Sequence, residues 1–340
     1  MSLTGGCQCG AVRYAIEGEP LGFARCHCTD CQRQSGSAFG LSLYCVAEEV
    51  SWQGDLATFE SVAESGNRVQ RRFCSKCGVR MYHDGGGDYI SIKAGTLDPG
   101  HELEPRAEIW TDSALPWVPL IEGVPRYERQ PPDQMELRTA WTAWRRGQTL
   151  AFYDENAADY AAYSDATEAH PRLARWIDTL PEGARVLDLG CGTGWAAAQI
   201  GRAGFDVRAM DGSRGLAEEA LQRHGIEVEI VDFAELSEKA AFEAVWAFFS
   251  LQHAPRDRMP DHLRRIWEAT TPGARLFLGL KEGTGSLRDE NGRLYTFYGE
   301  AEIARRLEHG GFEIVKVDRG TGRGFDGQPS DNLYVEAVRG

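Results

Sequence analysis

The segment VLDLGCGTGWAAAQI (residues 186–200) joins a short apolar run to a helix-forming run through three glycines at alternate positions. A glycine-rich turn between a buried strand and a helix lets a ligand approach the backbone at the helix N-terminus. The dinucleotide fingerprint G-x-G-x-x-G would require glycine at position 195, where Trp195 stands. Asp188 precedes the turn and would repel a pyrophosphate, so the segment favours a ligand that lacks phosphates and has a cationic amine.

Strand-like and helix-like segments alternate on both sides of this turn. Apolar runs typical of strands occupy residues 185–190, 205–211, 226–232, 244–250, 274–280, 312–317 and 332–338. Helical patterns occupy residues 134–146, 168–179, 194–203, 213–223, 256–270 and 299–309. Strands that alternate with helices predict an α/β Rossmann-like fold with a mostly parallel, doubly wound sheet.

Polar residues follow the ends of the neighbouring strands. Asp211 ends the second strand, 21 residues after Gly190, and is placed to accept both hydroxyls of a ribose. Asp232 and Phe233 end the third strand and suit the amine and the ring face of an adenine. FFSLQH (residues 248–253) ends the fourth strand. A ligand pocket is expected at the carboxyl ends of such strands.

This combination resembles the class I S-adenosylmethionine-dependent methyltransferases over about residues 150–340. The resemblance implies S-adenosylmethionine as cofactor and a small-molecule methyl acceptor. The implied cofactor-binding residues are Tyr160, Asp188, Gly190, Cys191, Gly192, Gly194, Asp211, Gly212, Ser213, Asp232, Phe233 and Ser250. The alternative is a cofactor-binding sensor without catalysis.

The stretch FYDENAADY (residues 152–160) resembles the lid that precedes the first strand in this family. Tyr153 and Tyr160 are expected to close over the sulfonium, and ordinary helix packing is the alternative for each. His253 is a candidate general base, which is needed only if the acceptor must lose a proton, or it lines the pocket. Tyr153 and His253 are therefore the predicted catalytic residues.

The tail of the chain resembles methyltransferases of small molecules, and no N-P-P-Y-type tetrapeptide follows the fourth strand. Cationic and phenolic side chains there are candidates for recognising an anionic acceptor. They are Lys281, Arg288, Arg293, Tyr295 and Tyr298. A solvated charged loop is the alternative reading of the same residues.

Seven of the nine cysteines lie in three groups within the first 77 residues. The groups are the pair Cys7 and Cys9, the triplet Cys26, Cys28 and Cys31, and the pair Cys74 and Cys77. The odd count argues against a disulfide framework. Structural zinc takes four ligands and catalytic zinc commonly keeps three, so two pairs can close one site while the triplet holds a second, open one. The triplet could instead recruit His27, His83 or a carboxylate and be closed.

The motifs GGCQCGAVRY, CHCTDCQRQSGSAFG, RRFCSKCGVRMYH, AGTLD and IWTDSALPWV, in this order, resemble the glutathione-dependent formaldehyde-activating enzymes over about residues 1–130. The resemblance implies a mostly-β zinc fold, with Cys7, Cys9, Cys74 and Cys77 on a structural zinc and Cys26, Cys28 and Cys31 on a second one. It also implies a carbon–sulfur lyase that acts on the glutathione adduct of formaldehyde. A non-catalytic binding or oligomerisation module is the alternative.

The charge and the composition of the chain argue against several classes of protein. The formal net charge is −14, with 12 Lys and Arg against 17 Asp and Glu in residues 1–130 and 25 against 34 in residues 131–340. Neither half has the basic balance of a nucleic-acid-binding protein. No apolar run approaches a membrane span, and the N-terminus lacks signal-peptide features, so a cytoplasmic protein is expected. Pro131-Pro132 marks the expected boundary between domains at 1–132 and 133–340, and the sequence leaves the oligomeric state open.

Overall fold

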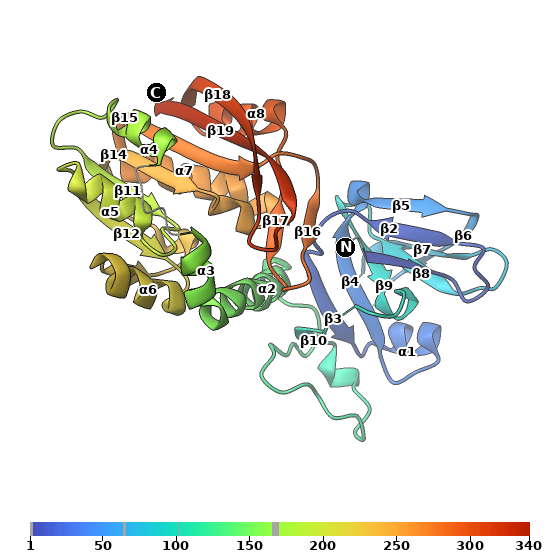
Figure 1. Cartoon of the computed structure of the whole chain (residues 1–340). Helices are drawn as coiled ribbons and strands as arrows, with labels where there is room; N and C mark the ends of the chain where they lie inside the picture. The colour runs from blue at the N-terminus through green and yellow to red at the C-terminus, as the bar shows by residue number, and fades with distance from the viewer. Residues whose placement is uncertain (1–2, 64–65, 102, 165–169) are drawn as a thin grey trace. The chain divides into compact units, whose positions relative to one another are not determined.

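The computed structural model describes residues 3–63, 66–101, 103–164 and 170–340. The chain forms two compact units, residues 1–146 and 147–340 (Figure 1). Helix α2 (Met135–Glu155) crosses this division and begins shortly after the boundary predicted at residues 132 and 133. The two units are described separately below.

The first unit is mostly β-structure, as the cysteine-rich sequence predicted. Its smaller sheet has the order β1-β2-β5, and its larger sheet has the order β10-β3-β4-β9-β8-β7-β6. The strands are β1 (Leu3–Gly6), β2 (Arg13–Ile16), β3 (Gly22–Cys26), β4 (Gly40–Val46), β5 (Val50–Gln53), β6 (Leu56–Val62), β7 (Arg68–Cys74), β8 (Arg80–Asp84), β9 (Tyr89–Lys93) and β10 (Ala107–Ile109). One short α-helix, α1 (Thr29–Ser35), follows β3.

The core of this unit lies between its two sheets. Tyr14 and Ile16 of β2 pack with Leu43 of β4 and with Ile90 and Ile92 of β9. Successive strand side chains point to opposite faces of a sheet. The other face of the large sheet is therefore free to carry polar groups near α1.

The second unit contains a seven-stranded sheet with the order β13-β12-β11-β14-β15-β19-β18 (Figure 1). Its strands are β11 (Arg185–Leu189), β12 (Asp206–Asp211), β13 (Val228–Ile230), β14 (Phe242–Phe248), β15 (Thr270–Lys281), β18 (Phe312–Arg323) and β19 (Pro329–Arg339). The first five in this list run parallel, and β19 is antiparallel to both β15 and β18. A two-stranded ribbon is formed by β16 (Ser286–Arg288) and β17 (Leu294–Thr296).

Helices cover both faces of this sheet. They are α3 (Ala157–Ser164), α4 (Pro171–Ile177), α5 (Trp195–Arg202), α6 (Arg214–His224), α7 (Met259–Ala269) and α8 (Glu300–His309). The helix predicted over residues 168–179 is seen as α4, and its first two residues lie outside the described part of the chain.

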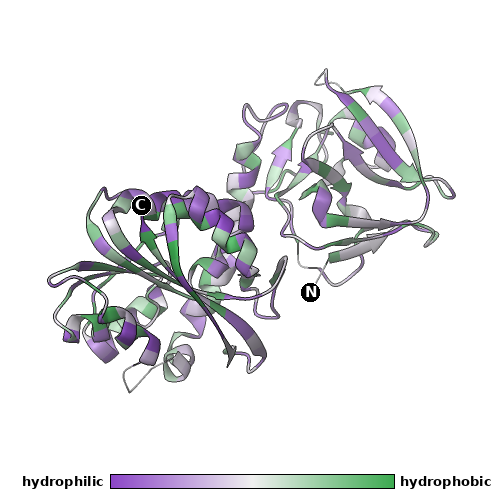
Figure 2. Ribbon diagram, turned by 90° about the horizontal axis from the view of Figure 1, so that it is seen from above, coloured by the Kyte–Doolittle hydropathy of each residue, from purple (hydrophilic) through white to green (hydrophobic). Residues whose placement is uncertain are grey.

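Alternate side chains of the central strands enter two separate hydrophobic cores. Val186 and Trp246 pack with Trp176 of α4, whereas Leu187 and Val245 pack with residues of α7 and α8. Figure 2 shows hydrophobic residues along the strands between these layers. A sheet that is buried on both faces confirms the predicted doubly wound α/β fold.

Among the described residues, no helix combines the length and the apolar content that a bilayer-spanning segment requires.

Candidate cofactor site and metal centres

The glycine-rich turn after β11 is held against the neighbouring strand. The backbone N–H groups of Gly190 and Cys191 both donate to the Met210 carbonyl of β12, at 2.8 and 3.0 Å. Gly194 has a positive φ of 74° and precedes α5 as its N-cap residue. The N-terminus of α5 therefore lies at the carboxyl edge of the sheet, directly after this turn.

Two glycines of this turn have different surroundings. A Cβ on Gly190 would lie 2.2 Å from the Ser250 Cβ and 3.3 Å from the Phe233 ring. Ser250 also donates its hydroxyl to the Leu189 carbonyl at 2.7 Å. A Cβ on Gly192 would meet no atom within 4 Å. The turn is thus packed against the next strand ends at Gly190 and opens into free space at Gly192.

Two carboxyl groups, the buried Asp188 and the partly buried Asp211, flank that open space. Asp188 accepts a hydrogen bond from the Ala197 N–H at 3.0 Å. Asp211 accepts from the N–H groups of Gly192 and Ser213, both at 2.8 Å. Burial raises the pKa of Asp188 to about 8, with a further contribution from Asp211, and burial also raises the pKa of Asp211. Within the described residues no ion pair with Lys or Arg involves either group, so a cationic ligand would stabilise both.

Asp154 is a further polar residue at this edge. It lies in α2 and accepts the Ser213 hydroxyl at 2.6 Å and the Gly215 N–H at 2.9 Å. Ser213 in turn caps α6 by accepting the Leu216 N–H. A carboxylate at a helix N-terminus is stabilised by the exposed N–H groups there, so Asp154 fixes the turn after Asp211.

Asp232 and Phe233 follow β13. Asp232 accepts the Ala234 N–H at 2.7 Å, and Glu235 accepts the Asp232 N–H at 2.7 Å. This reciprocal capping box fixes the short helix Phe233–Glu235 and sets the Phe233 ring beside Gly190. The Phe233 ring therefore lies beside the glycine-rich turn.

The buried Tyr153 and the partly buried His253 form a hydrogen-bonded pair. The Tyr153 hydroxyl lies 3.0 Å from the His253 Nε2, and the His253 Nδ1 lies 2.6 Å from the Leu294 carbonyl. Since a carbonyl only accepts, Nδ1 holds the proton, and Tyr153 donates to Nε2. Burial lowers the pKa of His253 to about 4, which keeps the imidazole neutral near pH 7.

Further predicted acceptor-binding residues lie around this pair. The Tyr295 ring lies 4.9 Å from the His253 ring, and the Lys281 Nζ lies 4.2 Å from the Tyr295 ring centre. Arg293 is buried, pairs with Asp289 at 2.6 Å and lies 5.3 Å from the Tyr295 ring centre. The Tyr160 ring lies 5.0 Å from the Tyr153 ring. Two other predicted residues point elsewhere: Arg288 donates to the Thr149 hydroxyl, and Tyr298 lies under Arg256.

The first unit brings the two cysteine pairs together. The Sγ atoms of Cys7, Cys9, Cys74 and Cys77 all lie within 4.8 Å of one another. The Cys7–Cys9 and Cys9–Cys74 sulfur distances are 3.5 and 3.8 Å. Tetrahedral zinc with bonds of about 2.3 Å places its sulfurs roughly 3.8 Å apart. These four residues therefore fit one closed zinc site.

The triplet forms a separate cluster with three thiols. Cys26, Cys28 and Cys31 have mutual Sγ distances within 4.8 Å, and no histidine or carboxylate of the described chain joins them at that range. Instead, the His27 Nε2 lies 2.7 Å from Glu108, and the His83 Nε2 lies 3.5 Å from an Arg80 nitrogen. The alternative of a triplet closed by either histidine is therefore not seen in this structure.

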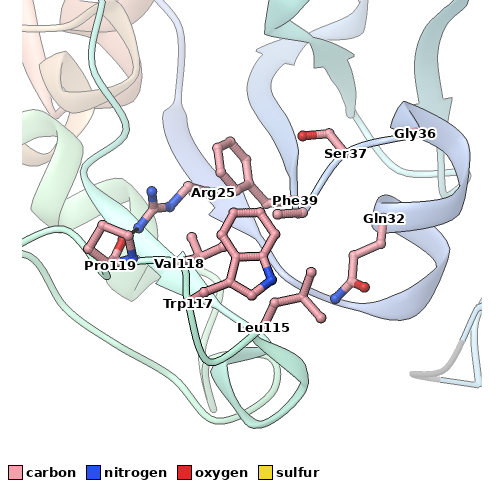
Figure 3. Close-up of a pocket in the computed structure, with 10 residues that line it drawn as sticks. Arg25, Gln32, Gly36, Ser37, Phe39, Leu115, Trp117, Val118 and Pro119 are labelled. Atoms are coloured by element: carbon pink, nitrogen blue, oxygen red, sulfur yellow. Dashed lines mark hydrogen bonds between the residues drawn. The ribbon is translucent and has the colours of Figure 1, made fainter.

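A cavity of about 610 Å³ lies next to the helix that contains Cys31 (Figure 3). Its lining residues are Arg25, Gln32, Gly36, Ser37, Ala38, Phe39, Leu115, Trp117, Val118 and Pro119. Arg25 pairs with the buried Glu108 and lies 4.9 Å from the Phe39 ring centre. The cavity thus combines apolar walls with a few polar groups.

Two family models match this chain. Residues 2–113 match the glutathione-dependent formaldehyde-activating enzymes, and residues 186–273 match a methyltransferase domain. The chain contains a domain of each kind. Both resemblances predicted from the sequence are confirmed.

Curated relatives match one domain or the other. A malonyl-[acyl-carrier protein] O-methyltransferase of Erwinia pyrifoliae is 32% identical over 107 residues, which are 29% of this chain and 38% of that protein. A putative glutathione-dependent formaldehyde-activating enzyme of Halomonas elongata is 31% identical over 87 residues, which are 24% of this chain and 55% of that protein. The chain thus spans about half or less of the lengths of these two relatives.

A solved structure supports the fold of the methyltransferase domain. The 1,6-didemethyltoxoflavin-N1-methyltransferase of Burkholderia thailandensis has a TM-score of 0.50 and 24% identity. The match covers 59% of this chain and 89% of that structure. At this identity the likeness establishes the fold alone.

Sequence reasoning missed Asp154 and the polar residues that face the cysteine triplet. Asp154 lies within a helix, 59 residues before Ser213, and no local pattern connects the two. The one signal in the sequence was that Asp154 directly follows Tyr153, a predicted lid residue. Gln34 was also missed. It lies one helical turn after Cys31 and donates a hydrogen bond to the Cys31 sulfur at 3.5 Å.

Proposed function

We propose that the methyltransferase domain transfers a methyl group from S-adenosylmethionine to a small-molecule acceptor. The observation that supports this most is the pair of carboxyl groups with raised pKa values, Asp188 and Asp211, beside the open space at Gly192. A ligand with a cationic amine and a sulfonium supplies the positive charge that these groups lack. A nucleotide phosphate at the same place would add negative charge to them.

Each part of the site has a proposed role in holding the cofactor. Asp211 accepts hydrogen bonds from the ribose hydroxyls, and Phe233 packs against the adenine. Asp188 and the turn around Gly192 hold the methionine end. When bound, S-adenosylmethionine supplies a methyl carbon activated by sulfonium. The protein then has to align the acceptor and exclude water.

Tyr153 and His253 are proposed to remove a proton from the acceptor. Tyr153 would accept at its oxygen the proton that the acceptor oxygen or nitrogen loses when it is methylated. The Tyr153 proton passes to the His253 Nε2, which is neutral and already accepts that hydrogen bond. The Leu294 carbonyl holds the imidazole in the required tautomer. Lys281 and Arg293 are cations beside this pair, and Asp289 is bound to Arg293. We propose that these two cations bind an acidic or anionic group of the acceptor.

Cofactor binding and turnover test this proposal separately. Isothermal titration calorimetry should show S-adenosylmethionine binding to the full chain and a large loss with Asp211→Ala. The exposed Asp206, at the other end of β12, provides the matched control Asp206→Ala, which should bind normally. Release of S-adenosylhomocysteine with a panel of acidic small molecules then distinguishes an enzyme from a sensor. Binding without release for any acceptor would favour the sensor.

We further propose that the first domain binds two zinc ions and acts on a thiol–aldehyde adduct. The observation in favour is the three-thiol cluster that no described histidine or carboxylate completes, with a cavity beside its helix. Bound zinc there would polarise a carbonyl or hold a thiolate. In the adduct-forming direction, the thiol sulfur bonds to the carbonyl carbon, and the thiol proton ends on the former carbonyl oxygen.

Native mass spectrometry and a variant test the second proposal. Two zinc ions per chain are expected, with one lost in Cys28→Ala while the pair site keeps its own. The variant should lose turnover of the glutathione–formaldehyde adduct and keep its fold. A soluble, one-zinc variant with unchanged adduct turnover would refute catalysis at the triplet. Loss of solubility would support a docking or oligomerisation module.

A further inference from the structure

The turn between β18 and β19 extends past the carboxyl edge of the methyltransferase sheet. Because β19 is antiparallel to both β15 and β18, β18 runs in the same direction as β15 and ends at the same edge. Pairing of β15 stops at Lys281, opposite Asn332, whereas β18 and β19 pair as far as Arg323 and Pro329. The turn that joins them therefore lies at the edge where the glycine-rich turn and the proposed acceptor site lie.

Phe325, in this turn, contacts aromatic side chains of two helices. Its ring centre lies 5.7 Å from that of Phe152 in α2, 5.6 Å from that of Tyr160 and 5.7 Å from that of Tyr163 in α3. The Tyr163 hydroxyl also donates to the Arg323 carbonyl, which holds the turn against α3. Rings from α2, α3 and the turn therefore form one cluster.

Tyr295 of β17 adds a further ring on another side of Tyr153. The Tyr295 ring lies 4.9 Å from that of His253, which is hydrogen-bonded to Tyr153. The Arg293 guanidinium lies 4.4 Å from the Phe152 ring centre and 5.3 Å from the Tyr295 ring centre, so it connects the two groups of rings. Tyr153, the proposed proton acceptor, thus lies among aromatic side chains from several elements.

Three polar groups beside these rings lack a partner. Within the described residues, no hydrogen bond or ion pair involves the Lys281 Nζ or the hydroxyl groups of Tyr160 and Tyr295. Tyr295 is 5% exposed, yet solvent reaches its oxygen, whereas the unpaired Tyr298 oxygen is fully buried. The polar atoms of buried side chains are normally hydrogen-bonded, so an unpaired one that solvent still reaches is suited to a ligand.

The two cations of the site differ in their partners. Arg293 donates its Nε to Asp289 at 2.7 Å, and a terminal nitrogen lies 3.8 Å from Asp326. Arg293 therefore shares its charge with two carboxylates. The Lys281 Nζ lies 4.2 Å from the Tyr295 ring centre, and no carboxylate of the described chain pairs with it. Burial lowers the pKa of Lys281, so an anionic group of a ligand would stabilise its ammonium form.

We infer that the methyl acceptor is a hydroxylated aromatic acid, whose ring packs against the aromatic side chains around Tyr153 and whose acid group binds Lys281 and the Tyr295 hydroxyl. The inference rests on the proposed function and narrows it by naming the class of acceptor. The ring hydroxyl supplies the proton that Tyr153 is proposed to accept. Aromatic rings attract one another edge to face or offset, so the rings of Tyr160 and Phe325 favour an aromatic ligand over a saturated one of the same size. An acid group on Lys281 forms a charge-assisted hydrogen bond, which is stronger where water is largely excluded.

Titration calorimetry on the full chain, saturated with S-adenosylhomocysteine, tests the inference with three probes. They are 4-hydroxybenzoate, trans-4-hydroxycyclohexanecarboxylate, which has the same polar groups on a saturated ring, and 4-hydroxybenzamide, which lacks the charge. The aromatic acid should bind roughly 3- to 10-fold more tightly than the saturated acid. It should bind roughly 10- to 100-fold more tightly than the amide.

Variants separate the roles of the turn and of the lysine. Phe325→Leu keeps an apolar side chain but removes the ring, so it should abolish most of the preference for the aromatic over the saturated acid. Lys281→Gln should abolish most of the preference for the acid over the amide, and Lys281→Arg should retain it. The matched controls are Phe205→Leu, directly before β12 at the opposite edge of the sheet, and Lys316→Gln, on the exposed part of β18. Neither control should change either preference.

The affinity of each variant for S-adenosylhomocysteine shows that its fold is kept. Equal affinity for the aromatic and the saturated acid, or a preference that Phe325→Leu leaves unchanged, would overturn the aromatic class. Equal affinity for the acid and the amide, or a preference that Lys281→Gln leaves unchanged, would exclude the role of Lys281. If a chain that binds S-adenosylhomocysteine binds none of the three probes, the inference is wrong and the proposed cofactor site stands. A chain that does not bind S-adenosylhomocysteine would contradict both.

Discussion

Replacing Asp188 by asparagine should stabilise the cofactor-free methyltransferase domain and at the same time weaken S-adenosylmethionine binding. The Asp188 carboxyl is 2% exposed, and burial raises its pKa to about 8. In the unfolded chain the same group ionises near its ordinary value of 3.8. A raised pKa in the folded state means that stability falls as the pH rises from about 4 to about 8.

The size of the effect follows from these two pKa values. At pH 7 the pH is about three units above the pKa of Asp188 in the unfolded chain. Each unit lowers the free energy of unfolding by about 1.36 kcal/mol, so the raised pKa of Asp188 costs the folded domain roughly 4 kcal/mol. Asparagine removes it but buries an amide whose extra N–H costs about 1–3 kcal/mol without a partner. The net gain should be roughly 1–3 kcal/mol at pH 7, and near pH 4, where the ionisation penalty is nearly gone, the variant should be about 1–3 kcal/mol less stable than the wild type. Lost contact with the cofactor amine should weaken binding roughly 10- to 100-fold.

Scanning calorimetry at several pH values measures the first effect, and titration calorimetry measures the second. The transition of the methyltransferase domain is the one that S-adenosylmethionine shifts in the wild type. The control Asp206→Asn changes an exposed aspartate on the next strand and should alter neither quantity. The reasoning is refuted if Asp188→Asn lowers the melting temperature at pH 7, or if the two proteins depend on pH in the same way.

Four further outcomes are expected. Gly190→Ala should destabilise its domain by about 2–4 kcal/mol in urea denaturation, because φ is 72° and the new Cβ would lie 2.2 Å from the Ser250 Cβ. Gly192→Ala, which faces open space, should cost about 1 kcal/mol, and equal losses would contradict the geometry. Cys28→Ala should lose one zinc ion and keep the other in native mass spectrometry, whereas loss of both would show that the two sites are not independent. Methyl-transfer rates should stay flat from pH 7 to about 5 and fall near pH 4 if His253 is the base, because burial lowers its pKa to about 4. A fall near pH 6.5 would exclude that role.

Local sequence patterns were sufficient to predict the fold classes and the two cysteine clusters. The alternation of apolar strands and helices predicted the doubly wound sheet, because each strand needs cover on both faces. The spacing of the cysteines predicted two clusters, because closely spaced thiols in a chain without disulfides are typical of zinc sites. The glycine pattern and Asp188 predicted a turn at the carboxyl edge of the sheet, because a parallel sheet presents its carboxyl ends at one edge.

Only the tertiary structure determined which distant residues meet at these sites. Asp154 caps the helix after Asp211 because α2 ends beside it, and no spacing in the sequence encodes that approach. His253 is fixed as a neutral acceptor by the Leu294 carbonyl, 41 residues away. The cations beside the cysteine triplet come from strands β7, β8 and β9, and it is sheet register that places Arg71 and Lys93 on one face. Composition and short motifs identify which reactive side chains the protein contains. Burial and strand register decide the charge state of those side chains and the residues that they contact.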